Sequence, residues 1–163
     1  MAVTLGPLDL VVVDSLETAL HTHFGWSRFR AGQRPVVEAV LSGRDALAVL
    51  PTGGGKSLCY QLPALIRGGL VVVISPLVAL MEDQVLQLRR RGIAAACLHA
   101  GLDPVRRQQA MAALRDESLR LLYLAPERLQ GEATQRLLET HAAEGRLVAL
   151  AVDEAHCISA WGH

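Results

Sequence analysis

The sequence predicts an α/β domain in which a mostly parallel β-sheet is covered by helices on both faces. Five short apolar runs alternate with amphipathic stretches along the chain. The runs cover residues 46–50, 70–75, 94–98, 119–124 and 147–152. Strands that are apolar throughout, rather than alternating, are typical of parallel strands buried on both faces. The length of 163 residues and the hydrophobic content of 51% are enough for one packed domain.

The stretches between the runs predict helices. Asp14, with Glu17 three residues later, indicates a capping box that opens a helix over about 15–23. A second helix is expected over 33–41, closed by Gly43. The amphipathic stretches 77–91, 104–115 and 132–143 are expected to cover the sheet. Ligands of such folds bind at the carboxyl ends of the strands, so the residues after each run are the first candidates for a site.

A glycine-rich loop follows the first run and precedes an expected helix. Its sequence is Pro51-Thr52-Gly53-Gly54-Gly55-Lys56-Ser57. The glycines let successive N–H groups curl around phosphate oxygens, and the helix N-terminus adds positive charge. Lys56 can reach the β- and γ-phosphates of a nucleotide, and the Ser57 hydroxyl can ligate Mg²⁺. Leu50 stands where the strict phosphate-loop pattern has glycine, and a glycine-rich turn with an incidental lysine is the alternative.

The last apolar run, 147–152, leads into Asp153-Glu154-Ala155-His156. Placing two carboxylates at the end of a buried strand costs solvation free energy, which a bound cation can offset. We expect Asp153 to contact Mg²⁺, through water, and Glu154 to be the base that orients an attacking water. A surface turn that carries two acids is the alternative.

These motifs resemble those of the RecQ family of DNA helicases, and the resemblance covers 24–163. The Asp153-Glu154-Ala155-His156 sequence is identical to the DEAH box of superfamily 2 helicases, and 157–163 is similar to the start of the RecQ aromatic-rich loop. The phosphate loop with 58–64 is likewise similar to that family. One departure is Ala160, where the family has a glutamine. The resemblance implies a RecA-like nucleotide-binding domain over 1–163, incomplete, with a helical lead-in over about 1–32.

The resemblance also implies an adenine-reading motif in 24–33. Gln33 has the carboxamide needed for paired hydrogen bonds to adenine N6 and N7. Trp26 offers a ring face for stacking, and Arg30 a planar guanidinium that can cover the base or meet phosphate. From the residues alone, an aromatic turn that packs onto the first helix is an equally good interpretation.

Two further segments, 75–84 and 123–129, resemble family motifs that support single-stranded DNA. The residues expected to contact it are Ser75, Pro76, Asp83, Gln84, Pro126, Glu127 and Arg128, together with Trp161 of the aromatic loop. Backbone N–H groups at strand-to-helix junctions suit phosphate contacts, although ordinary turns are the alternative. His156 and Trp161 are expected to pass DNA binding on to the ATP site, since base stacking contributes about 1–3 kcal/mol for any sequence.

Charge, cysteine spacing and composition bear on how DNA would bind, on whether zinc is present and on where the protein is located. Lys plus Arg equals Asp plus Glu at 16 each, so DNA would bind through placed amides and local cations rather than a broad positive field. The three cysteines, at 59, 97 and 157, lack zinc-site spacing, so we expect buried thiols and no zinc. His21, His23, His99 and His141 stand outside any motif and are interpreted as surface or helix-packing residues. No apolar run or leader indicates a membrane protein, and the composition fits the bacterial cytosol.

The family's activity is ATP-dependent 3′ to 5′ unwinding of duplex DNA in replication, repair and recombination. RecQ-like motors hold ATP between two RecA-like domains, and the second would supply an arginine finger worth about 10³–10⁵ in rate. That domain lies outside these 163 residues, so we expect them to bind Mg-ATP weakly, hydrolyse it slowly and need the full-length motor for single-stranded and forked DNA. Two alternatives remain: a phosphate-loop ATPase without a nucleic-acid role, and a non-catalytic truncated fragment.

Overall fold

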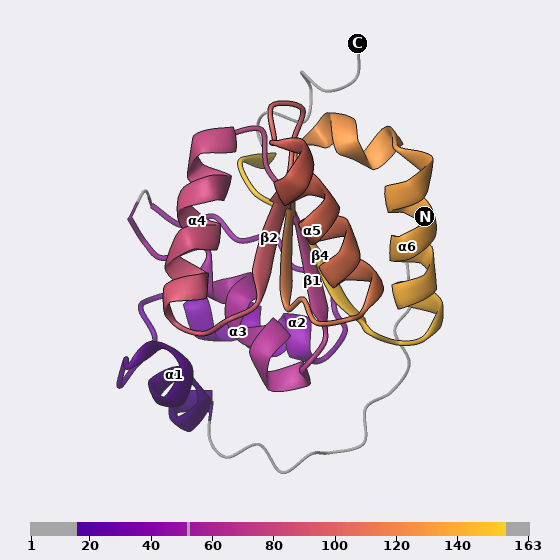
Figure 1. Cartoon of the computed structure of the whole chain (residues 1–163). Helices are drawn as coiled ribbons and strands as arrows, with labels where there is room; N and C mark the ends of the chain where they lie inside the picture. Colours follow the sequence, from indigo (N-terminus) through magenta and orange to yellow (C-terminus); the bar gives the residue numbers. More distant parts are fainter. Residues whose placement is uncertain (1–15, 52, 156–163) are drawn as a thin grey trace. The chain divides into compact units, whose positions relative to one another are not determined.

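The computed structural model describes residues 16–51 and 53–155, and Figure 1 follows the chain through them. The elements, in chain order, are α1 (Leu16–Phe24), α2 (Gln33–Leu41), α3 (Leu58–Arg67), β1 (Leu70–Ile74), α4 (Val78–Arg90), β2 (Ala95–Leu98), α5 (Pro104–Arg115), β3 (Leu121–Leu124), the 3₁₀ turn η1 (Pro126–Gln130), α6 (Glu132–Ala143) and β4 (Leu147–Val152). The chain divides into two compact units, with the boundary between Gly68 and Gly69.

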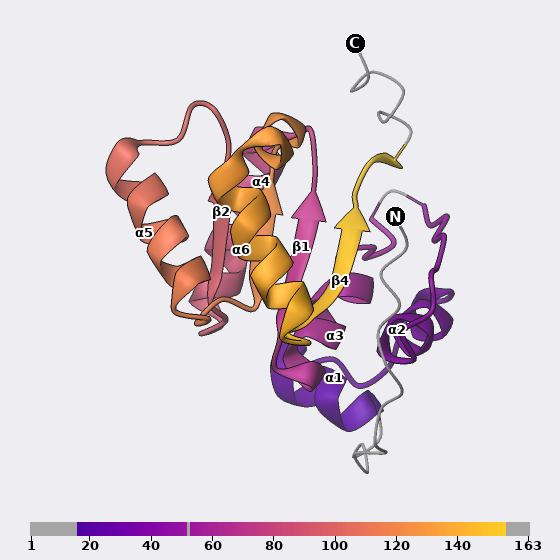
Figure 2. The same cartoon turned by 90° about the vertical axis from the view of Figure 1, so that its right-hand side faces the viewer.

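The second unit is built on a four-stranded parallel sheet in the order β2-β3-β1-β4. Helix α4 covers one face of this sheet, and α5 and α6 cover the other, as Figures 1 and 2 show from two directions. Every residue of β1, β2 and β3 is buried, which is why these strands are apolar throughout rather than alternating. The predicted α/β class, with helices on both faces of a parallel sheet, is confirmed.

Strand β4 lies at one edge of the sheet and is less buried than the other strands. Its side chains are half-buried or exposed, with Leu150 at 55% and Val152 at 38% exposure. Because β4 pairs only with β1, its outer edge has no strand partner in the part of the chain that the structure describes.

The expected strand over 46–50 is wrong. The described backbone there forms no strand, and the side chains of Leu47 and Val49 are 86% and 88% exposed. An apolar run becomes a buried strand only where a neighbouring strand satisfies its N–H and C=O groups. No described strand pairs with these residues, so the hydrophobic pattern alone was not sufficient.

The first unit is helical. Helices α1, α2 and α3 enclose a core of Leu16, Leu20, Phe24, Val37, Leu58 and Leu62. Helix α1 ends one residue later than expected and α2 has the expected bounds, whereas residues 14 and 15, where the capping box and the start of the first helix were expected, lie outside the described residues. No described helix is both long and apolar enough to cross a membrane.

Two cysteines are buried, as expected: Cys59 in the first unit and Cys97 in the second. Burial raises the pKa of the Cys59 thiol from its ordinary 9.0 to about 11. Burial also raises the pKa of Cys97, and the neighbouring Glu82 carboxylate adds to that rise. The third cysteine, Cys157, lies outside the described residues.

Candidate functional site

The glycine-rich loop of the first unit has the backbone conformation that its sequence requires. Gly53 and Gly55 both have left-handed backbones, with φ of +77° and +76°. This conformation costs L-residues roughly 1–2 kcal/mol and costs glycine little. A turn hydrogen bond of 2.8 Å from Gly54 N to the Pro51 carbonyl closes the loop. Thr52 lies outside the described residues.

Lys56 and Ser57 follow the loop at the start of α3. Ser57 is the N-cap residue of this ten-residue helix, and its carbonyl accepts from Gln61 N at 2.9 Å. Neither side chain is deeply buried, and no side chain caps the helix start among the described residues. The first N–H groups of a helix carry partial positive charge and attract anions. The predicted lysine and serine therefore lie where a bound phosphate is favoured.

Gln33 ties α2 to this loop. Its side chain is 1% exposed, and its Nε2 donates to the carbonyls of Gly54 at 3.2 Å and Gly55 at 3.0 Å. Its Oε1 accepts from Arg30 N at 2.7 Å. The Arg30 guanidinium donates to the Gly53 carbonyl at 2.5 Å. The structure thus brings two residues of the predicted adenine motif into direct contact with the predicted phosphate loop.

Trp26 lies in the turn that follows α1. Its ring stacks on Phe24, with the ring centroids 5.5 Å apart and the planes 23° from parallel. The side chain is nevertheless 42% exposed. The packing of this turn onto the first helix is therefore present, and part of the indole surface stays accessible for a further stacking partner.

In the second unit, four loops leave the sheet at one edge because all four strands run parallel. The residues that follow the strands, in sheet order, are His99, Ala125, Ser75 and Asp153. Three backbone bonds lock this edge: Ala125 N to Leu98 O at 3.0 Å, Ser75 N to Leu124 O at 3.0 Å, and Asp153 N to Ile74 O at 2.9 Å. We call this row the carboxyl edge.

The two predicted acids lie at the β4 end of the carboxyl edge. Asp153 Oδ1 accepts from Glu154 N at 3.0 Å, so the first carboxylate fixes the backbone of the second. Glu154 has a left-handed backbone, with φ of +52°. Such a conformation in a residue other than glycine stores strain and is over-represented at functional positions. Both side chains are half-buried.

The residues predicted to contact DNA are distributed over two junctions of the carboxyl edge. Ser75 is buried, and its Oγ accepts from Leu77 N at 3.3 Å just before α4 begins. Asp83 is exposed on α4 and accepts from Gln87 Nε2 at 2.6 Å. Pro76 and Gln84 are half-buried in the same segment. Ser75 and Pro76 therefore lie on the connection from β1 to α4, and Asp83 and Gln84 lie on α4 itself; their contact with DNA stays a prediction.

The other junction is formed by η1, which begins at Pro126. Glu127 is exposed, and Arg128 is half-buried. The Arg128 guanidinium donates from Nη2 to the His99 carbonyl at 3.0 Å, which links η1 to the end of β2. Arg128 therefore has a structural contact that the sequence did not predict.

Some predicted residues are not brought together within one unit. Ser57 and Asp153, the expected magnesium ligands, belong to different units, so their common site stays a prediction. His156 and Trp161 lie outside the described residues.

Two histidines with no assigned role are buried: His141, whose Nε2 lies 2.8 Å from the Leu114 carbonyl, and His99. A signal for His99 was present, because it directly follows the apolar run 94–98 in the same way as Asp153 follows 147–152.

Comparisons with known proteins agree on one family. The DEAD/DEAH box helicase family matches residues 30–163. "ATP-dependent DNA helicase RecQ" of Synechocystis sp. is 50% identical over 148 residues, which are 91% of this chain and 30% of that protein. "Probable ATP-dependent DNA helicase RecS" of Bacillus subtilis is 44% identical over 149 residues, which are 91% of this chain and 29% of that protein. The chain thus spans less than a third of the length of these relatives.

A solved structure supports the fold. The chain is similar to a hypothetical ATP-dependent RNA helicase from Sulfolobus tokodaii, with a TM-score of 0.67 over 92% of this chain and 44% of that one. The sequence identity is 19%, so this similarity concerns the fold alone.

Proposed function

Since the chain belongs to the DEAD/DEAH box helicase family, and within it to the RecQ group, we propose that it is the nucleotide-binding part of an ATP-dependent DNA helicase. The proposed activity is ATP hydrolysis coupled to 3′ to 5′ translocation and duplex unwinding, in the bacterial cytosol. The phosphate loop is the observation that best supports this proposal. Its left-handed glycines, its position before α3 and its contacts with Arg30 and Gln33 form one connected group.

The first unit would bind the nucleotide. The amides of the loop, from Thr52 to Gly55, would surround the phosphates, and Lys56 would neutralise the β- and γ-phosphates. Gln33 would read adenine, while Arg30 and Trp26 would lie against the base or its phosphates. Gln33 Nε2 now donates to loop carbonyls, so recognition of the base would require the carboxamide to exchange these partners.

The second unit would supply the hydrolytic groups. Mg²⁺ prefers oxygen ligands in octahedral geometry, and the Ser57 hydroxyl and Asp153 carboxylate fit that preference. The ion would offset the phosphate charge. Glu154 would orient the attacking water, and its position is fixed by the Asp153 Oδ1 bond to its amide. His156 would connect this pair to the DNA-sensing loop that contains Trp161.

Single-stranded DNA would contact the carboxyl edge of the second unit. Helix α4 starts without a side-chain cap in the described chain, so its first-turn amides are suited to a phosphate oxygen. The contacting residues would be Ser75, Pro76, Asp83, Gln84, Pro126, Glu127 and Arg128. Full unwinding of forked DNA would need the second RecA-like domain.

The nucleotide site can be tested through Lys56, which is the only lysine in the chain. Mg-ATP should protect Lys56 from acetylation by an amine-reactive ester, with the α-amino group as the internal control. Mg-GTP should protect it less if Gln33 reads adenine, and the difference should vanish in Gln33→Ala. Equal acetylation with and without millimolar Mg-ATP, in a folded protein, contradicts the proposal.

The DNA role is tested separately with a fluorescent single-stranded oligonucleotide. We expect binding whose affinity falls as salt rises, because phosphate contacts release counterions. Nucleotide protection of Lys56 without any DNA binding would indicate instead a phosphate-loop ATPase with no nucleic-acid role. Failure of both tests would indicate a non-catalytic fragment.

A further inference from the structure

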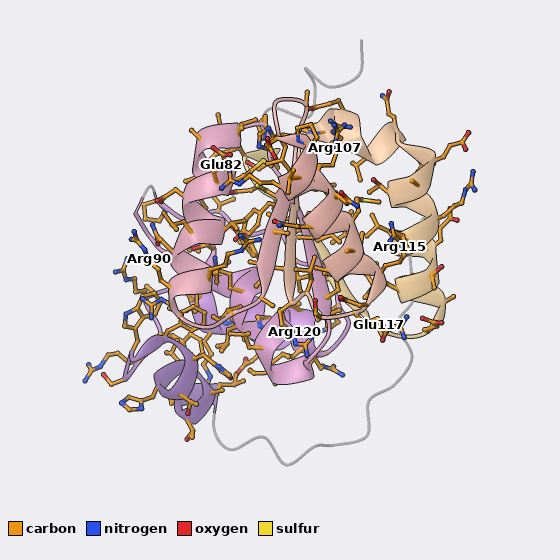
Figure 3. All side chains as sticks on the ribbon, viewed as in Figure 1. Glu82, Arg90, Arg107, Arg115, Glu117 and Arg120 are labelled. Atoms are coloured by element: carbon orange, nitrogen blue, oxygen red, sulfur yellow. The ribbon has the colours of Figure 1, made fainter. Side chains whose placement is uncertain are left out.

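Three side chains that can ligate a metal converge at the β2 end of the second unit. Glu82 comes from α4, Cys97 from β2, and His99 from the carboxyl edge immediately after β2. One oxygen, one sulfur and one ring nitrogen from these residues all lie within 4.8 Å of one another. Figure 3 shows Glu82 at the end of α4 that lies over the carboxyl edge. Cys97 and His99 are two residues apart in the sequence, and the proximity of their ligand atoms places both side chains in the same cluster.

The His99 ring is a buried polar group without a hydrogen-bond partner at one nitrogen. The residue is 5% exposed, and Nε2 makes no hydrogen bond within the described part of the chain. Glu82 Oε1 lies 3.5 Å from this nitrogen. Buried polar atoms in proteins are almost always satisfied, so an exception calls for an explanation such as an ion. The unpaired nitrogen points into the cluster.

We infer that Glu82, Cys97 and His99 form a Zn²⁺ site. Zinc binds thiolate, imidazole and carboxylate in tetrahedral geometry, and three protein ligands leave one position for water. A cavity of about 80 Å³ adjoins two of the three ligands, Glu82 and Cys97, and has room for a water molecule beside them. The sulfur ligand selects against Mg²⁺ and Ca²⁺, so the site is chemically distinct from an ATP-bound magnesium.

The geometry requires only a small adjustment. Zinc–ligand bonds of roughly 2.0–2.3 Å place tetrahedral ligand atoms roughly 3.3–3.8 Å apart. The Glu82 side chain is 45% exposed and can close that difference by a rotamer change, while Cys97 and His99 stay buried. Binding forms the zinc–sulfur bond and releases the thiol proton to the solvent. The spacing of the cysteines could not indicate this site, because only one of its three ligands is a cysteine.

Arg106 competes with the ion. Its Nη1 lies 3.6 Å from Glu82 Oε1, so the guanidinium pairs with the carboxylate that zinc would bind. Zinc would displace it and join the first half of α4 to the end of β2. Asp83 and Gln84, the next residues of α4, are DNA contacts in the proposed function. If that function holds, zinc would fix the position of this part of the DNA track.

The test uses the tag-free 163-residue protein, treated with chelator and titrated with Co²⁺ alone. We expect one equivalent to produce a sulfur-to-cobalt charge-transfer band with tetrahedral d–d bands, and Zn²⁺ to abolish them. Cys97→Ser should remove the charge-transfer band, and Cys59→Ser, the matched buried thiol of the first unit, should retain it. Circular dichroism of each variant establishes that it is folded.

Two surface variants keep the inference testable if Cys97→Ser fails to fold. Glu82→Gln should weaken Co²⁺ binding at least tenfold, because even outer-shell changes cost about 10–100-fold. Arg106→Gln should strengthen it about fivefold, since a competing charge is removed. Folded protein without a cobalt spectrum, or a band unchanged in Cys97→Ser, overturns the inference. Neither outcome depends on nucleotide or DNA binding, so the proposed function can fail or succeed independently.

Discussion

Gln33 Nε2 lies 3.0 Å from the carbonyl oxygen of Gly55, which joins the start of α2 to the phosphate loop. The carboxamide has no unused polar group in this arrangement, because its oxygen accepts from Arg30 N and its nitrogen serves two loop carbonyls. The loop is therefore held by a buried side chain 22 residues earlier in the chain. Substitution of either residue should therefore change the conformation of the loop directly, and ligand binding only as a consequence.

Gly55→Ala should destabilise the first unit more than Gly53→Ala. Both glycines have left-handed backbones, so both substitutions cost roughly 1–2 kcal/mol in conformation. A Cβ on Gly55 would also lie 2.5 Å from Gln33 Nε2, whereas one on Gly53 would meet nothing within 4 Å. Urea denaturation should show an additional loss of about 1 kcal/mol or more for Gly55→Ala. Equal losses in the two variants would show that the Gln33 contact is unimportant.

Glu154→Gln and Glu154→Gly should both abolish ATP hydrolysis and retain Mg-ATP binding. The role of Glu154 in orienting water needs the carboxylate, which both variants lack. Glu154→Gly should also keep the stability of the chain, because glycine relieves a left-handed backbone at φ +52°. Single-turnover hydrolysis and thermal unfolding measure the two effects. Hydrolysis at the wild-type rate in Glu154→Gln would remove this residue from the mechanism.

Arg128→Ala should lower both the stability and the affinity for single-stranded DNA. The substitution breaks the Arg128 Nη2 bond to the His99 carbonyl, which is worth about 1 kcal/mol. Arg107, exposed on α5 and labelled in Figure 3, is the matched control because Arg107→Ala removes the same charge. Fluorescence anisotropy across a salt series should show a lower salt slope only for Arg128→Ala. Equal effects of the two substitutions on DNA binding would indicate a non-specific charge effect.

The Cys59 thiol should make the stability of the first unit fall at alkaline pH. Its pKa is raised to about 11 in the folded chain, so the folded state holds this proton more tightly than the unfolded state. The resulting stabilisation is complete below pH 9.0 and is lost as the pH rises toward about 11. The difference in unfolding free energy between wild type and Cys59→Ala, measured by urea denaturation, isolates this group from the arginines and tyrosines. A pH-independent difference would contradict the raised pKa.

The sequence predicted where helices and strands lie better than it predicted which strands pair with one another. Strands β1, β2 and β3 were found because continuous burial forces continuous hydrophobicity, and α5 and α6 have the predicted bounds. The run at 46–50 has the same local pattern, yet Leu47 and Val49 are exposed. A hydrophobic run shows that a segment can be buried but does not identify the strand beside it.

In the candidate site, too, local residue patterns could be predicted from the sequence, whereas contacts between distant segments could not. Lys56, Ser57 and the acids were predicted because phosphate and metal chemistry limits the residue types at each position. The contacts of Gln33 with loop carbonyls and the burial of His99 depend on chain segments far apart in sequence. No spacing rule encodes such contacts, and they became evident only in the folded chain.

The exposed side of β4 has a consequence for how the protein behaves in solution. Among residues 16–51 and 53–155 no strand pairs with the outer edge of β4, and such an edge is a template for another extended chain; Leu150 and Val152 add exposed apolar surface. Two copies can pair there, strand against strand, without altering the interior of either. We expect the sedimentation coefficient of the 163-residue polypeptide to rise with concentration, and Leu150→Lys to suppress that rise. Titrations of nucleotide or metal should therefore be repeated at several protein concentrations, so that binding is separated from self-association.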